Sequence, residues 1–188
     1  MKQIVKKINK TISQISEGDG IINAVKSIKC NERISFIDEL AVLGDGTQVY
    51  FFVNIYGPAK IGKNVLISSY VSIQGEGTVV GDNCRIGDFS FLPAGTTIEE
   101  NVFIGQNVSI CNDKNPKSGN KDWKKLPVTI KKNSSIGSGC VILPGLTIGE
   151  NCMLGAGSVL TKDMPNDSTW VGNPAATINK TKKECLCS

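Results

Sequence analysis

The sequence contains no histidine among its 188 residues. This absence excludes a zinc centre with three histidine ligands. Histidine is also the side chain that proteins use most often as a general base near neutral pH. Any acid–base chemistry in this chain therefore has to use other groups, such as carboxylates.

Long hydrophobic runs and a strong net charge are also missing. No apolar run approaches the roughly 18 residues that a bilayer span needs, and the start MKQIVKKINK has no hydrophobic region of the secretory type. The net charge of +4 is mild and dispersed, which does not indicate a nucleic-acid partner. We therefore expect one cytoplasmic domain without a membrane span.

What the sequence does contain is a six-residue repeat from Ile37 to Leu160, each hexad opening with an aliphatic residue. One extra residue near Val79 shifts the phase, and one long interruption follows Ile110. The nineteen openers are Ile37, Leu43, Val49, Ile55, Ile61, Ile67, Ile73, Val80, Ile86, Leu92, Ile98, Ile104, Ile110, Ile130, Ile136, Ile142, Ile148, Leu154 and Leu160. An extended hexad spans about 20 Å and stacked coils lie about 4.8 Å apart, so three hexads per coil predict a triangular prism, an all-β parallel β-helix. A sandwich of ordinary strands would instead show turn signals every 8–12 residues or so.

Within the hexads, glycine often follows the opener and the fifth position is usually small. We expect these glycines to form the tight corners, because glycine accepts a positive φ without a Cβ clash. Cys84, Cys140 and Cys152 occupy the small position, which predicts buried packing thiols. The seven cysteines form no CxxC pair, so disulfides and metal ligation are not indicated.

These patterns divide the chain into three parts. Residues 1–36 are predicted to be an N-terminal helical cap, because Ile4, Ile8, Ile12 and Ile15 share one helical face. This helix would cover the open first coil, and a basic amphipathic helix on a membrane surface is the alternative. Residues 37–160 form the β-helix with an external loop at 111–129, and residues 161–188 form a C-terminal extension.

The repeat Ile-Gly-x-x-small-x, followed by LGAGSVLTKDMP and GNPA, resembles the hexapeptide-repeat acyltransferases. The resemblance implies a left-handed β-helix and a homotrimer; parallel crossovers are otherwise right-handed. Within that superfamily, LGDGTQVYFFVNI, IEENVFIG and CNDKNPK resemble the N-acetyltransferases of nucleotide-linked amino sugars. Acetyl-CoA as co-substrate, a nucleotide-linked (dideoxy)amino sugar as acceptor, sites between subunits and no metal are what this resemblance implies.

The resemblance also suggests which residues bind the coenzyme. Ser138 and Ala156 match family positions beside the pantetheine, and Thr161 and Lys162 match positions near the nucleotide end. Ser138 and Ala156 are also simply residues of the size that the repeat permits. After GNPA the family usually has Arg or Lys, whereas this chain has Ala176, so the candidate phosphate ligands are Lys180, Lys182 and Lys183 or a lysine of a neighbouring subunit.

The absent histidine favours an amine as the acceptor. A hydroxyl with a pKa near that of water, about 15.7, needs a base, whereas an amine with a pKa near 8 is partly neutral at pH 7. Asn54 occupies the family's histidine position in FFVNI and can hydrogen-bond without acting as a base. Asp88 falls where relatives often carry asparagine, and it is our candidate for holding the ammonium group and accepting its proton. The alternative for Asp88 is a solvent-facing corner residue, like Asp82.

In the resembling enzymes, the interrupting loop reaches over an adjoining subunit to the sugar-nucleotide cleft. By this resemblance, Asn112 and Asp113 would bind sugar hydroxyls or orient the amine, and Lys114 and Lys117 would meet a diphosphate. The alternative is that Asn112 and Asp113 fold the loop base through side-chain turns. Lys117 replaces an arginine of many relatives, with the loss of a bidentate phosphate contact.

Three functions follow from these observations. The first is the N-acetyltransferase, working by direct transfer without a covalent acyl-enzyme, because no histidine is available to activate Cys111. The second is a hexapeptide O-acyltransferase that uses a carboxylate base on a small hydroxyl acceptor. The third is a non-catalytic trimeric β-helix scaffold.

Overall fold

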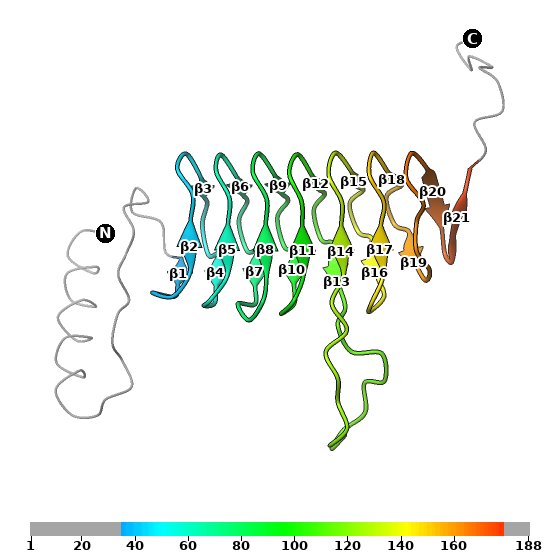
Figure 1. The fold of residues 1–188 in the computed structure, drawn as a ribbon, viewed down its shortest axis with the longest axis horizontal. Coiled ribbons are helices and arrows are strands. Elements are labelled where there is room, and N and C mark those ends of the chain that lie inside the picture. Colours follow the sequence, from blue (N-terminus) through cyan, green and yellow to red (C-terminus); the bar gives the residue numbers. More distant parts are fainter. Residues whose placement is uncertain (1–34, 179–188) are drawn as a thin grey trace, which may run out of the picture.

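A computed structural model describes residues 35–178, which coil into a column of stacked turns (Figure 1). The strands fall into three sheets, called here faces A, B and C. The predicted N-terminal helix and Lys180 lie outside the described residues. The parallel strands and the stacked coils confirm the all-β fold and are consistent with a left-handed β-helix.

The three faces contain every strand of the described chain. Face A contains β1 (Phe36–Ile37), β4 (Asn54–Ile55), β7 (Ser72–Ile73), β10 (Phe91–Leu92), β13 (Ser109–Ile110), β16 (Val141–Ile142) and β19 (Val159–Leu160). Face B contains β2 (Val42–Leu43), β5 (Lys60–Ile61), β8 (Val79–Val80), β11 (Thr97–Ile98), β14 (Thr129–Ile130) and β17 (Thr147–Ile148). Face C contains β3 (Gln48–Val49), β6 (Leu66–Ile67), β9 (Arg85–Ile86), β12 (Phe103–Ile104), β15 (Ser135–Ile136), β18 (Met153–Leu154), β20 (Thr169–Gly172) and β21 (Ala175–Thr177).

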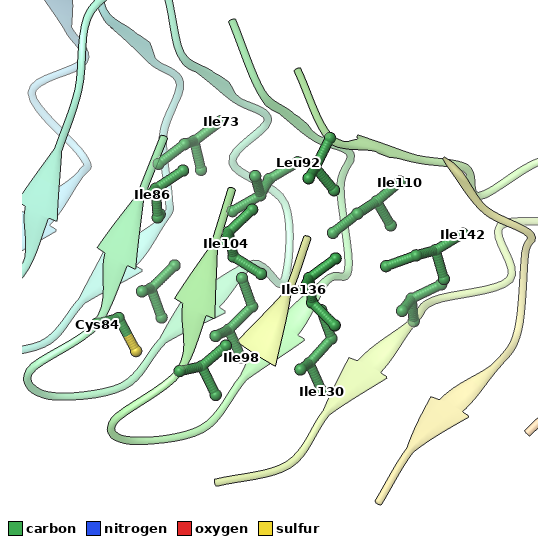
Figure 2. Packing of buried hydrophobic residues seen from close by; sticks show 14 of the residues in the cluster. Ile73, Cys84, Ile86, Leu92, Ile98, Ile104, Ile110, Ile130, Ile136 and Ile142 are labelled. Atoms are coloured by element: carbon green, nitrogen blue, oxygen red, sulfur yellow. The ribbon is translucent and has the colours of Figure 1, made fainter. Parts of the chain in front are cut away.

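The hexad openers form the core of the prism. Each opener is the second residue of one strand from β1 to β19, and all but the half-buried Leu43 are buried. Figure 2 shows openers of successive coils stacked along the interior, with the Cys84 thiol beside them. Cys84, Cys140 and Cys152 are at most 2% exposed, which confirms the prediction of buried packing thiols. The six-residue repeat thus predicted both the positions of the strands and the residues that fill the interior.

The glycines after the openers have a different role from the predicted one. Gly105 does not have a positive φ; instead, a Cβ there would lie 2.6 Å from the backbone nitrogen of Ser138 on the next coil. Glycine is needed at this position because neighbouring coils approach closely. The left-handed residue lies two positions later, at the second residue of the corner, where asparagine and glycine are equally common.

Stacking continues beyond Leu160. Met164 forms a parallel bridge with Ile148, and β20 pairs in parallel with β18. Trp170 of β20, 6% exposed, pairs with Leu154 in register and packs in the core, and β21 then returns antiparallel to β20. Within residues 35–178, no helix is long and apolar enough to cross a membrane.

Candidate active site

Three of the predicted site residues lie at one corner of the prism. The turns from face C to face A, called here the CA corner, consist of residue pairs 51–52, 69–70, 88–89, 106–107, 138–139 and 156–157. The second residue of each pair donates its backbone N–H to the first residue of the preceding pair, from Gly157 to Ser138 (2.8 Å) through to Tyr70 to Phe51 (3.0 Å). Asp88, Ser138 and Ala156 therefore lie on one continuous line along the axis.

Asp88 is half-buried on this line. Its Oδ1 accepts a hydrogen bond from the backbone N–H of Ser69 at 3.0 Å. Asp82, at another corner, accepts from the backbone N–H of Lys63 at 2.7 Å in the same way. This bond is thus a general device of the repeat, and it fixes the Asp88 carboxylate at the surface of the CA corner.

The C-terminal half of the CA corner is bare. Ser138 and Ala156 are exposed, and Ser138 Oγ donates to Gln106 Oε1 at 2.6 Å. A Cβ added at Gly157 would meet nothing within 4 Å, and one at Gly139 would only touch Gly157 at 4.0 Å. This stretch therefore leaves room for an extended ligand beside the backbone.

Asn54 begins β4 and lies on face A. It is half-buried, and it pairs in register with Phe36 on one side and Ser72 on the other. Since the following residue, Ile55, points inward, the Asn54 side chain is on the outer surface of face A.

The external loop leaves the opposite edge of face A, between β13 and β14 (Figure 1). Asn112 Nδ2 donates to the carbonyl of Ala94 at 3.3 Å, and Asp113 Oδ1 accepts from the backbone N–H of Asn115 at 2.9 Å. Both side chains thus take part in the local folding of the loop base, as Asx residues often do. Lys114 and Lys117 are exposed further out.

The returning limb of the loop is fixed to the body of the prism. Lys125 Nζ lies 3.6 Å from a carboxylate oxygen of Glu76 and donates to the Glu76 carbonyl at 3.3 Å. Glu76 belongs to the coil with the extra residue that was noted near Val79. The backbone N–H of Leu126 then donates to the carbonyl of Asn112 at 2.9 Å, which closes the loop.

Thr161 and Lys162 follow β19 at the turn from face A to face B, the corner from which the loop also leaves. Both are exposed, and Lys162 Nζ lies 5.3 Å from the centroid of the Trp170 ring. In one chain, face A therefore separates two groups of predicted residues. Asp88, Ser138 and Ala156 lie at one edge, whereas the loop, Thr161 and Lys162 lie at the other.

A column of aromatic rings on the CA corner was not predicted from the sequence. Phe52, Tyr70 and Phe89 stack with centroid distances of 5.0 Å and 4.7 Å, and they are 46%, 50% and 60% exposed. Their spacing of 18 and 19 residues, one coil each, is the signal that could have revealed the column.

The cysteine thiols are poor nucleophiles in this setting. Burial raises the pKa of Cys111, and it is the largest of the causes that raise the pKa of Cys84 and Cys140. Because the thiolate is the reactive form, these groups stay protonated and unreactive near neutral pH. Among the described residues, no three Cys, Asp or Glu side chains gather into a metal-binding group.

Comparisons with known proteins agree with the repeat. The model of the bacterial transferase hexapeptide (six repeats) matches residues 77–112 and 127–162, and that of the hexapeptide repeat of succinyl-transferase matches residues 58–87. A Staphylococcus aureus protein named as an acetyltransferase is 34% identical over 168 residues, covering 87% of this chain and 77% of that protein. The chain therefore belongs to the hexapeptide-repeat transferase family.

Other relatives match a smaller part of the chain. The galactoside O-acetyltransferase of Escherichia coli is 40% identical over 88 residues, 45% of this chain and 43% of that protein. The chain spans about half the length of several further curated relatives that it matches.

A solved structure shares the fold. A variant of AntD, an N-acyltransferase from Bacillus cereus, was solved with dTDP-4-amino-4,6-dideoxyglucose and coenzyme A. The TM-score is 0.64 at 23% identity, over 76% of this chain and 84% of that one. At this identity, the likeness concerns the fold alone.

Proposed function

We propose that this protein is an acetyl-CoA-dependent N-acetyltransferase that acts on a nucleotide-linked amino sugar. The observation that carries the proposal is the CA corner, where the Asp88 carboxylate is in line with the open stretch at Ser138 and Ala156, in a chain without histidine. Family membership and the ligands of AntD support the same reaction class.

In the proposed reaction, the neutral amine attacks the thioester carbonyl carbon. A C–N bond forms, the C–S bond breaks, and coenzyme A leaves as the thiolate. The surplus proton of the amine passes to Asp88, to solvent or to the departing thiolate. A backbone amide of the prism surface stabilises the oxyanion while the carbonyl is tetrahedral.

We further propose that the active unit is a homotrimer with sites between subunits. The two groups of site residues occupy opposite edges of face A, so one chain alone does not unite them. A cyclic assembly would bring the CA corner of one copy near the loop and Lys162 of the next. Face A also exposes Phe36, Tyr56 and Phe91, each 37–39% exposed, as apolar surface for such a contact.

A second candidate is an O-acyltransferase on a small hydroxyl acceptor, which the similarity to the galactoside O-acetyltransferase favours. The missing histidine argues against it, because a hydroxyl needs a base more than an amine does.

The experiment that separates these functions measures thiol release from acetyl-CoA with nucleotide-linked 3-amino and 4-amino sugars, and with matching hydroxyl sugars as controls. We expect turnover with amino acceptors alone. Turnover confined to hydroxyl sugars would overturn the proposal. Silence across the panel, together with no binding of coenzyme A, would favour a non-catalytic scaffold.

A further inference from the structure

The aromatic column formed by Phe52, Tyr70 and Phe89 is unusual in its backbone conformation. These residues have φ values of 57°, 61° and 60°, a region that bulky side chains rarely adopt. At the equivalent position of the corner between faces B and C, the chain uses asparagine or aspartate in six turns: Asn64, Asn83, Asn101, Asn133, Asn151 and Asp167. The turn itself therefore does not require an aromatic residue, so turn geometry does not account for the three exposed rings.

The column also has a direction. Phe89 is the ring nearest the C-terminal coils, because the next corner residue, Asn107, has no aromatic ring. Further along the corner, Gly139 and Gly157 have no side chain. Asp88 immediately precedes Phe89 in the same turn. A ligand that lies along the glycine stretch and extends past Asp88 would thus meet the Phe89 ring first, then Tyr70 and Phe52.

We propose that this column binds an acyl group longer than acetyl, carried on coenzyme A. The inference rests on the proposed function and widens its donor from acetyl-CoA to longer acyl-CoA thioesters. It takes the pantetheine to lie beside Ser138 and Ala156, as the family resemblance implies, with the thioester near Asp88. From the coil of Asp88 to that of Phe52 is two coil spacings, roughly 10 Å, a length that suits a medium acyl chain. In the proposed trimer, the acceptor would reach Asp88 from the loop of a neighbouring copy, which leaves the rest of the CA corner to the donor.

The expected preference follows from the burial of apolar surface. A methylene that leaves water completely strengthens binding about fourfold, so one that lies half-covered against the rings contributes about twofold. Octanoyl-CoA has six more methylenes than acetyl-CoA. It should bind this protein on the order of ten to a hundred times more tightly than acetyl-CoA.

The test is calorimetric titration of the full chain with coenzyme A and with acetyl-, butyryl-, hexanoyl- and octanoyl-CoA, without acceptor. The variant Tyr70→Asn/Phe89→Asn removes two rings and introduces the residue that the left-handed position favours elsewhere in this chain. Phe103→Ala is the matched control, because Phe103 is likewise an exposed aromatic residue (43%) but lies on face C in β12. We expect the affinity to rise with chain length in the unmodified protein and in Phe103→Ala. The double variant should lose this rise while it retains its affinity for coenzyme A.

Three results would overturn the proposal in distinguishable ways. Equal affinity for acetyl-CoA and octanoyl-CoA would contradict the acyl site while leaving the proposed function intact. No binding of coenzyme A or any thioester would remove the coenzyme premise that both proposals share. If the double variant changed the molecular mass by light scattering without altering a chain-length preference, the rings would form a subunit contact instead.

Discussion

Asp88 and Ser138 lie on the same corner of the prism, separated by the single coil that carries Gln106. The backbone N–H of Asn107 donates to the carbonyl of Asp88 at 2.7 Å, and Ser138 Oγ donates to the Gln106 side chain at 2.6 Å. Two coil spacings amount to about 10 Å. In the proposed function, the Asp88 carboxylate would lie at the thioester of the donor and the Ser138 hydroxyl beside its pantetheine.

We predict that Asp88→Asn lowers kcat about 100-fold and leaves the affinity for coenzyme A nearly unchanged. The amide oxygen can still accept the hydrogen bond from Ser69, so the corner should keep its shape while the proton acceptor is lost. Steady-state kinetics with the amino-sugar acceptor and calorimetry with coenzyme A measure the two effects. Asp82→Asn is the matched control, because Asp82 makes the same backbone contact at another corner and should show unaltered turnover. Unaltered turnover in Asp88→Asn as well would remove Asp88 from the site.

Lys162→Ala should raise the KM for acetyl-CoA about tenfold and the KM for the acceptor much less. Its ammonium group is exposed and lies over Trp170, a position from which it can meet a phosphate of the coenzyme. Lys132→Ala serves as the control, because Lys132 forms a surface ion pair with Glu150 at a different corner. Equal increases in both KM values would argue against a phosphate contact.

The fold was largely readable from the sequence, whereas the grouping of site residues was not. The openers specify the strands because a buried residue recurs once per side of the prism, and this is a local constraint. The relation between Asp88 and Ser138 depends on counting coils across the 18-residue interruption between β13 and β14, which only the three-dimensional stacking resolves. The role of the glycines that follow the openers is not visible in the sequence for a similar reason, since the contact that excludes a Cβ at Gly105 comes from a different coil.

Cys111→Ser should retain turnover within about twofold. Burial raises the pKa of Cys111, so its thiol is protonated at neutral pH and becomes a thiolate only at more alkaline pH than an ordinary cysteine. Alkylation at pH 7, followed by peptide mass spectrometry, should therefore modify Cys111 slowly, and faster as the pH rises. An acyl group found on Cys111 after rapid quenching, with loss of activity in the serine variant, would replace direct transfer by a covalent mechanism.

Ile104→Ala should destabilise the prism by about 2–5 kcal/mol, because it opens a cavity at a fully buried position in the central coils. The neighbouring Phe103→Ala should cost about 1 kcal/mol or less, since that ring is 43% exposed on the outer surface of β12. Chemical denaturation followed by circular dichroism, at one protein concentration for all variants, compares the two. Each coil contacts mainly its neighbours, so loss of the central side chain should weaken stacking on both sides. A larger loss for Phe103→Ala than for Ile104→Ala would contradict the inward assignment of the hexad openers, on which the position of every proposed site residue depends.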